Sequence, residues 1–260
     1  MNRPYTDILF EQKEGVATIT LNRPHKRNAF RQRTLEELAK AFLQVGRDGS
    51  VGVVVLTGEG DNFCAGGDIG EMLGLTPQTG AVFVQHLSAL AQAITDCPKP
   101  VVAKIDGYCI GGGNELQLFC DLAVASGRAR FGQVGPKVGS APLWGGSLLL
   151  PRLLGLRRAK EMMFLCEPIT AARALEIGLV NRVVPASQLH DATDTLCRDL
   201  LRRSPQSLTL LKRSLHRGLA EEIRKDLSIL EGIYGTPELK EGMAAFLEKR
   251  EPNFKRIDRA

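Results

Sequence analysis

The sequence has no apolar run long enough to cross a membrane. Its most apolar stretch, residues 143–156, contains Pro151 and Arg152, whereas a membrane-spanning helix needs about 20 predominantly apolar residues. The first residues also form no apolar segment of the signal-peptide type. These absences predict a cytoplasmic protein with no membrane partner.

Metal-binding cysteine patterns are missing as well. The six cysteines form no CxxC pair and show no zinc-type spacing with the four histidines. In a chain of this length we expect them to be buried, reduced thiols. The sequence therefore predicts no metal site.

Phosphate loops and clustered positive charge are further absences. Neither GxxxxGKS/T nor GxGxxG occurs, and the basic residues are scattered although the net charge is +5. We therefore expect no nucleic-acid partner. RNA binding, attraction of a polyanionic small molecule and an ordinary solvated surface remain three explanations of the charge.

Strands and helices alternate over the first two thirds of the chain. Residues 16–21 alternate between apolar and polar, as in a half-buried strand, and residues 51–57 form a continuous apolar run, as in a strand covered on both faces. Residues 101–105 and 122–125 are two further strands. This order predicts an α/β fold with a parallel sheet built by right-handed crossovers.

Helices are expected after a capping box at residues 34–37, over residues 82–94, and almost throughout from Gly145 onward. The first of these helices has an apolar face formed by Leu35, Leu38, Phe42 and Val45. The helical last third is typical of a peripheral extension used in oligomerisation. We therefore divide the chain into a core of residues 1–200 and a C-terminal helical region of residues 201–260.

Two glycine-rich loops follow buried strands, at residues 63–68 and 107–113. The carboxyl ends of parallel strands meet at one sheet edge, so two N–H groups from these loops could hold one ligand oxygen. The three glycines 111–113 allow close approach of the backbone, and they open a helix whose first N–H groups lack partners. That arrangement stabilises an oxyanion, although two ordinary tight turns are the alternative. Glu115 lies one turn into this helix.

Together with other segments, these loops identify the chain as a member of the crotonase (enoyl-CoA hydratase/isomerase) superfamily. The segments that carry the resemblance are residues 63–68, 99–116, 120–121, 131–133 and 174–180. The resemblance implies a crotonase ββα spiral with a C-terminal helical trimerisation region, assembled as a homotrimer or hexamer. It also implies an acyl-CoA substrate and no tightly bound cofactor, because coenzyme A is part of the substrate.

The resemblance further assigns residues to the site. Glu115 is expected to be the acid–base residue, and the N–H groups of Gly67 and Gly112 are expected to hold the thioester oxygen. The residues expected around the acyl group and coenzyme A are Lys26, Arg27, Ala65, Gly66, Asp68, Gly111, Gln133, Gly135 and Trp144.

Several of these residues have an ordinary structural alternative. Lys26 and Arg27 are either contacts for the coenzyme A phosphates or solvated loop charges. Asp68 either faces the site or caps the next helix, and Trp144 either forms a wall for the acyl group or packs in the core.

A second acid is missing at the place where the hydratases of this superfamily carry one. In these enzymes another glutamate follows the helix glutamate by about twenty residues, and here that position is Gly135. A positioned acid or base typically contributes about 10²–10⁴-fold to the rate. A simple two-glutamate hydratase is therefore disfavoured.

Residues 131–140 resemble one branch, the 1,4-dihydroxy-2-naphthoyl-CoA synthases and the related alicyclic ketoacyl-CoA hydrolases. In this branch a tyrosine that matches Tyr234 reaches the active site, so we count Tyr234 among the catalytic candidates. Some of these synthases use bicarbonate as a base, held in part by the residue that matches Gln133. The catalytic aspartate of the synthases falls on Pro142 and their active-site tyrosine on Gly145, which disfavours naphthoate synthesis.

The sequence therefore predicts an acyl-CoA enzyme, most simply a lyase, that acts through an oxyanion-stabilised thioester enolate. The acyl group is expected to be cyclic or branched, and the reaction to be hydration, isomerisation or hydrolytic C–C cleavage. The alternatives are an acyl-CoA-binding homologue with little catalysis, a naphthoate-synthase-like ring-forming enzyme and an RNA-binding protein.

Overall fold

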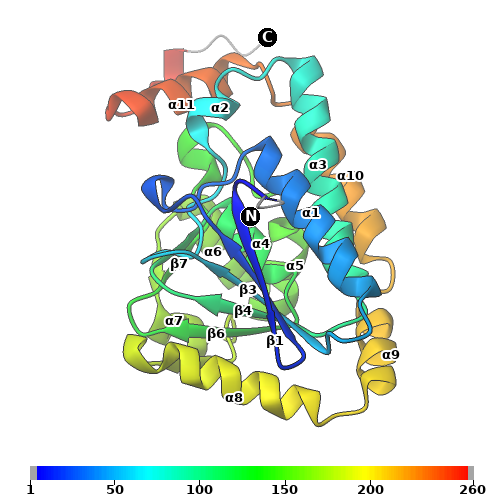
Figure 1. Cartoon of the computed structure of the whole chain (residues 1–260). Coiled ribbons are helices and arrows are strands. Elements are labelled where there is room, and N and C mark those ends of the chain that lie inside the picture. Colours follow the sequence, from blue (N-terminus) through cyan, green and yellow to red (C-terminus); the bar gives the residue numbers. More distant parts are fainter. Residues whose placement is uncertain (1–4, 257–260) are drawn as a thin grey trace.

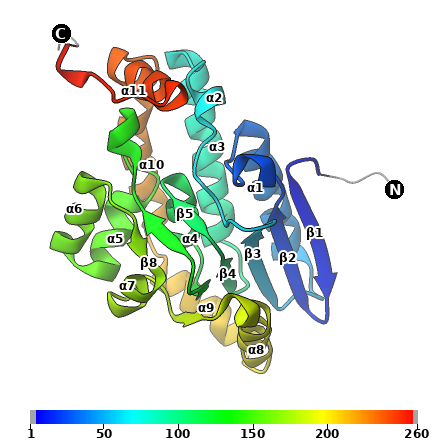
Figure 2. The same cartoon turned by 90° about the vertical axis from the view of Figure 1, so that its left-hand side faces the viewer.

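Two β-sheets form the centre of the molecule in the computed structural model, which describes residues 5–256 (Figures 1 and 2). The larger sheet has, in spatial order, β1 (Ile8–Lys13), β2 (Val16–Leu21), β3 (Val53–Gly58), β4 (Val101–Ile105), β6 (Leu122–Ser126) and β9 (Arg182–Val184). β1 pairs antiparallel with β2, and the other neighbours are parallel. The smaller sheet contains β5 (Tyr108–Ile110), β7 (Arg130–Gly132) and β8 (Ile169–Thr170).

The chain passes repeatedly from the larger sheet to the smaller one. Asp106 and Gly107 connect β4 to β5, which is followed by α4 (Gly112–Leu118), and β6 leads in the same way through β7 to the short helix η2 (Gly135–Val138). After β3, Cys64 pairs with Cys109 of β5. These strand–strand–helix repeats form the ββα spiral that the resemblance implies, and they bring successive loops to one edge.

Apolar side chains cover the larger sheet on both faces. On β3, Val54 and Leu56 face the main core, which includes α1 (Gln32–Arg47) and α3 (Pro77–Thr95). Val53 and Val55 face the opposite way, toward α8 (Leu189–Leu201), which runs along the bottom of the molecule in Figure 1. The continuous apolar run at residues 51–57 correctly predicted this double coverage.

The C-terminal helices are only partly peripheral. α10 (Leu219–Glu231) packs along α3, as Figure 1 shows, and its buried face consists of Leu219, Ile223, Leu227 and Leu230. α11 (Pro237–Glu248) packs against η2 and α2 (Ile69–Met72), while α9 (Pro205–Leu215) lies between α8 and α10 in the chain. The division at residue 200 stays a prediction, and residues 1–4 and 257–260 of its two regions lie outside the described residues.

Two helices begin earlier than the sequence predicted. Thr34 is the third residue of α1 rather than its cap, and its side chain accepts a hydrogen bond from the backbone N–H of Arg31. α3 begins at Pro77, because Thr76 caps it. A capping box locates the start of a helix only if its N-cap residue is recognised. The N-cap residue here is Arg31, and arginine is not a usual residue at that position.

Five strands were not predicted from the sequence: β1, β5, β7, β8 and β9. β5 intervenes between β4 and the helix that carries Glu115, so the glycine turn does not follow β4 directly. β8 and β9 interrupt the region from residue 145 onward that was expected to be nearly all helical. β5, β7, β8 and β9 have only two or three residues each, which is too few to show a strand period. The remaining helices are η1 (Pro24–Lys26), α5 (Gly146–Leu154), α6 (Leu156–Leu165), α7 (Ala171–Glu176), η3 (Ala186–Gln188) and η4 (Phe254–Arg256).

The six cysteines carry free thiols, as predicted, and all except the half-buried Cys120 are buried. Within residues 5–256, we find no helix with both the length and the apolar character that a membrane crossing requires.

Candidate active site

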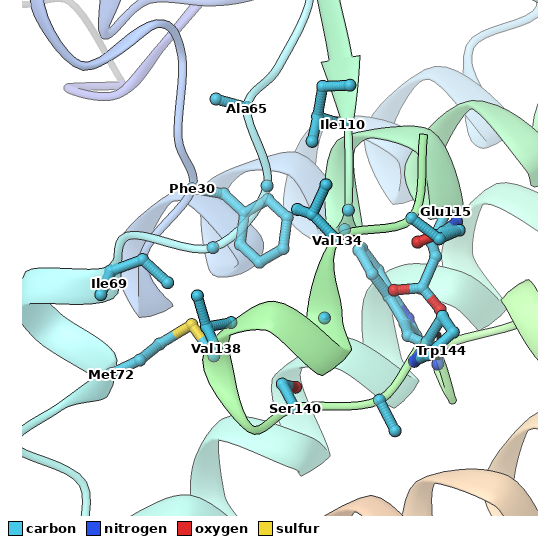
Figure 3. A pocket seen from close by; sticks show the side chains of 18 of the residues that line it. Phe30, Ala65, Ile69, Met72, Ile110, Glu115, Val134, Val138, Ser140 and Trp144 are labelled. Atoms are coloured by element: carbon cyan, nitrogen blue, oxygen red, sulfur yellow. Dashed lines mark hydrogen bonds between the residues drawn. The ribbon is translucent and has the colours of Figure 1, made fainter. Parts of the chain in front are cut away.

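A cavity of about 330 Å³ lies where the two glycine loops, η2 and α10–α11 converge. Its wall is mainly apolar. In Figure 3, Ile69 and Met72 lie at the opposite end of the cavity from Glu115 and Trp144. The large apolar side chains of the wall include Phe30, Ile69, Met72, Phe83, Leu87, Val138 and Trp144.

The two glycine loops touch each other through their backbones. The N–H of Ile110 donates to the carbonyl oxygen of Cys64 at 3.0 Å, and the N–H of Cys64 donates to that of Tyr108 at 2.9 Å. A β-carbon on Gly113 would lie 2.2 Å from the Cys64 carbonyl oxygen. Only glycine at position 113 therefore allows this contact without a backbone shift.

Two N–H groups on this wall are free to bind a ligand. Among residues 5–256, neither the Gly67 nor the Gly112 N–H has a hydrogen-bond acceptor, and both glycines line the cavity. Gly66 and Gly111 also line it, and their positive φ angles of 97° and 55° turn the chain at the two loops. Ala65 completes the lining of the first loop. The structure thus brings the two predicted donors to one cavity.

Glu115 is the one carboxyl group among the lining residues. Its side chain is buried, and its Oε1 accepts hydrogen bonds from the backbone N–H groups of Trp144, at 2.9 Å, and Gly146, at 3.1 Å. Burial raises the pKa of Glu115 to about 8; the two N–H groups oppose this shift and the charge of Asp226 adds to it. A carboxyl group with such a pKa can give or take a proton near neutral pH.

Tyr234 reaches the same cavity from the segment after α10. It is 3% exposed, and its ring packs edge-on against Phe83 with 6.0 Å between ring centroids. Burial, and then the charge of Glu115, raise the pKa of its hydroxyl. The hydroxyl therefore stays protonated near neutral pH and can act as a donor.

Gly135 and Gln133 lie on another part of the wall. Gly135 opens η2, and a β-carbon there would lie 3.2 Å from the carbonyl carbon and oxygen of Ser140. Gln133 is fully buried, and neither its amide nitrogen nor its amide oxygen has a partner among the described residues. This part of the cavity has no acid, and it contains an amide group whose hydrogen bonds are unmade.

Two predicted positions have structural roles. Asp68 does not belong to the cavity wall: its Oδ1 accepts the N–H of Gly70 and caps α2. The Trp144 ring is 1% exposed and its Nε1 donates to the carbonyl oxygen of Leu87. The ring therefore packs in the core while it also lines the cavity, and the backbone N–H of Trp144 contacts Glu115.

The cavity mouth carries some of the positive charge that the sequence suggested. Arg27 lines the mouth, and its guanidinium lies 5.1 Å from the centroid of the Tyr108 ring. Lys26 is exposed and is not among the lining residues, whereas Lys137 of η2 is.

Sequence reasoning missed Phe30, Tyr108 and Lys137. Tyr108 lies in the glycine-rich loop at residues 107–113, and Lys137 lies in the segment 131–140 that resembles one branch of the superfamily. Their positions in these segments could have indicated that they line the cavity. Phe30 reaches the site by pairing with Gly67, a contact between two segments that the sequence of neither segment shows.

Comparison with known proteins covers almost the whole chain. A family model described as Enoyl-CoA hydratase/isomerase matches residues 11–257. An enoyl-CoA hydratase from Mycobacterium avium subsp. paratuberculosis is similar with 29% identity and a TM-score of 0.88, over 96% of this chain and 99% of that one. An enoyl-CoA hydratase/isomerase from Pseudoalteromonas atlantica T6c has 30% identity and a TM-score of 0.85, over 96% and 100% of the two chains. An enoyl-CoA hydratase from Bacillus anthracis has 32% identity and a TM-score of 0.79, over 96% and 99%. The similarity is therefore not confined to the glycine loops.

Proposed function

Because the chain belongs to the enoyl-CoA hydratase/isomerase family, we propose that it converts an acyl-CoA thioester through an enolate held by Gly67 and Gly112, with Glu115 moving the proton. One observation supports this most strongly: a buried carboxyl group with a raised pKa lines the same cavity as two N–H groups that lack acceptors. Fixed donors aimed at developing charge are usually the largest single catalytic contribution.

The proposed chemistry begins with proton removal beside the thioester. Glu115 takes the proton, the electrons of the C–H bond move to the thioester oxygen, and the two N–H groups stabilise the negative charge that forms there. Oε1 of Glu115 is engaged by Trp144 and Gly146, so Oε2 is the oxygen free to exchange the proton. The enolate can then be protonated at another carbon, which isomerises the substrate. In hydration the enolate forms instead when water adds to the β-carbon of an enoyl thioester and gives a proton to Glu115, and in hydrolytic C–C cleavage it forms when water adds to a ketone carbonyl and the neighbouring C–C bond breaks.

Tyr234 is our candidate for the second proton-transfer group. No acid stands at Gly135, whereas the Tyr234 hydroxyl lies in the cavity near enough to Glu115 to feel its charge. A protonated phenol can donate a proton or a hydrogen bond to a reacting carbon or oxygen. This role does not require the second glutamate of the hydratases.

We further propose a cyclic or branched acyl group. The wall of the cavity is mostly apolar, and no side chain projects into it from Gly135. The test is turnover of a panel of straight-chain, branched and cyclic enoyl- and ketoacyl-CoA thioesters, with products identified by mass spectrometry. Fastest turnover of a straight-chain enoyl-CoA contradicts this substrate class. Tight binding without turnover of any thioester supports instead the acyl-CoA-binding homologue.

The rate is expected to depend on pH through Glu115. As the proton acceptor it must be ionised, and burial holds its pKa at about 8. We expect kcat/KM to rise about tenfold per pH unit below pH 8 and to level off above it, because this parameter reports ionisations of the free enzyme. Initial rates between pH 5.5 and about 9.5 measure the profile. A flat profile contradicts the role of Glu115 as base.

Bicarbonate is a second candidate for the missing base. The unpartnered Gln133 amide is a suitable donor for it, although the amide atoms are buried and must turn toward the cavity to reach it. A bicarbonate held there would supply a weak base beside the acyl carbons. If it does, activity falls in carbonate-depleted buffer and recovers when bicarbonate is added. Unchanged activity removes the proposal and leaves Tyr234 as the candidate.

We propose a homotrimer or hexamer as the assembly. Several large apolar side chains remain exposed on single chains, and Leu211 and Leu215 of α9, four residues apart, lie on one helix face at 59% and 81% exposure. Light scattering is expected to give three or six times the chain mass of 28.3 kDa. The mass of one chain contradicts the proposal.

A further inference from the structure

A buried arginine underlies the first glycine loop. Arg23 follows β2, is 8% exposed and is not part of the cavity wall. Its Nη2 donates to Oδ2 of Asp68 at 2.8 Å, and its Nη1 donates to the carbonyl oxygen of Ala29. One guanidinium group thus joins two segments that are distant in the sequence.

These two partners flank the backbone pair that presents Gly67. Phe30 follows Ala29 and pairs with Gly67 as an isolated parallel bridge. In that bridge the N–H of Phe30 donates to the carbonyl oxygen of Gly66, and the N–H of Asp68 donates to the carbonyl oxygen of Phe30, both at 2.8 Å. The N–H of Gly67 therefore points away from Phe30, on the side where it has no acceptor among the described residues.

Arg23 closes this bridge from outside. It binds Ala29, the residue before Phe30, and Asp68, the residue after Gly67. The two segments of the bridge therefore cannot separate or twist without breaking a hydrogen bond of Arg23. Burial alone would raise the pKa of Asp68, but the hydrogen bond and charge of Arg23 keep that pKa below its usual range. The pair is therefore ionised and charge-assisted.

A buried ion pair of this kind contributes little net stability in comparison with apolar packing, whereas its two hydrogen bonds hold the bridge at both ends. We propose that Arg23 is a positioning residue that fixes the direction of the Gly67 N–H and thereby half of the oxyanion site. The inference depends on the proposed function, since it concerns how well that site polarises a thioester.

The test uses hexanoyl-CoA labelled with ¹³C at its thioester carbon, whose carbonyl stretching frequency falls when hydrogen bonds polarise the bond. Wild-type protein is expected to lower the frequency on binding. In Arg23→Gln the lowering should shrink by half or more, and kcat for the best substrate should fall about 10–100-fold, because small misplacements of catalytic groups cost that much. KM is expected to change less than kcat, because Arg23 does not touch the cavity.

Arg31 provides the matched control. Its side chain donates two hydrogen bonds to Asp7, whose Oδ2 lies 4.0 Å from Nε of Arg23, but it makes no hydrogen bond to Ala29 or Asp68. Arg31→Gln is therefore expected to lower stability while leaving the carbonyl shift unchanged. Asp68→Ala should reduce the shift as Arg23→Gln does, and the double variant should be no worse than the more affected single variant, as expected for one shared contact.

If Arg23→Gln does not fold, Arg23→Lys serves, because an ammonium group keeps the charge but cannot reproduce the two-pronged contact. A wild-type carbonyl shift in Arg23→Gln or Arg23→Lys overturns the inference, and so does an equal loss in Arg31→Gln. If the wild-type protein binds hexanoyl-CoA without lowering the frequency, the proposed function fails, and the inference fails with it.

Discussion

Glu115→Gln is expected to lower turnover of the best acyl-CoA substrate by about 10²–10⁴-fold, the usual contribution of a positioned acid or base. Binding of the thioester should be retained. The glutamine carbonyl can still accept the two hydrogen bonds from Trp144 and Gly146, so the shape of the cavity is preserved while the exchangeable proton is lost. Steady-state kinetics gives the first quantity and calorimetric titration the second.

Glu11→Gln is the matched control, because Glu11 is an exposed residue of β1, an edge strand of the larger sheet, and does not line the cavity. It should have wild-type kinetics. Full activity of Glu115→Gln would remove Glu115 from the mechanism, and loss of thioester binding together with turnover would make its role structural.

The same variant has an expected signature in stability. Burial raises the pKa of Glu115 from 4.5 to about 8, so the folded state keeps a proton that the unfolded state releases between these values. Stability from this group is complete below pH 4.5 and is lost as the pH rises toward 8. Glutamine does not titrate, so Glu115→Gln should gain in melting temperature relative to wild type as the pH increases. A difference in melting temperature between Glu115→Gln and wild type that stays the same at all pH values would contradict the raised pKa of Glu115.

Gly113→Ala is expected to have the second largest effect. The added β-carbon would lie 2.2 Å from the Cys64 carbonyl oxygen, which is backbone and cannot rotate away. The two glycine loops must then move apart, and with them the N–H groups of Gly67 and Gly112. Overpacking of this kind typically costs about 1–3 kcal/mol of unfolding free energy, and a displacement of about 1 Å can cost about 100-fold in rate.

Chemical denaturation and kcat measure these two losses. Gly49→Ala is the control, because a β-carbon there meets no atom within 4 Å and the backbone has no positive φ. It should retain both stability and activity. A Gly113→Ala protein with wild-type kcat would show that the close contact of the loops is not needed for catalysis.

Much of the candidate site was predictable because its parts are local. The glycine run 111–113 allows close backbone approach wherever it lies, and Glu115 lies one turn into the helix that this run opens. The strand at residues 101–105 was likewise confirmed as β4, because a short apolar run before a turn has few alternatives. The resemblance to the family, confirmed by the comparisons, connected these pieces to the first loop.

Other assignments depended on contacts that no local pattern contains. Asp68 could have faced the cavity, but Arg23, far away in the sequence, draws its carboxylate to the other side. Trp144 lines the cavity and also packs in the core, because the Leu87 carbonyl oxygen accepts a hydrogen bond from its indole. Both outcomes depend on the position of a partner from another element.

The sequence by itself determined the alternating α/β order and the two glycine loops, because these follow from residue type and spacing along the chain, and its resemblance to the family implied the spiral and the missing acid at Gly135. Only the tertiary structure decided what surrounds Glu115. Burial beneath the loop of Trp144 and Gly146 raises its pKa, and the packing of α10 on α3 delivers Tyr234 to the same cavity. Solvent exclusion and contacts between distant segments set the properties of that carboxyl group, and neither is encoded in a local motif.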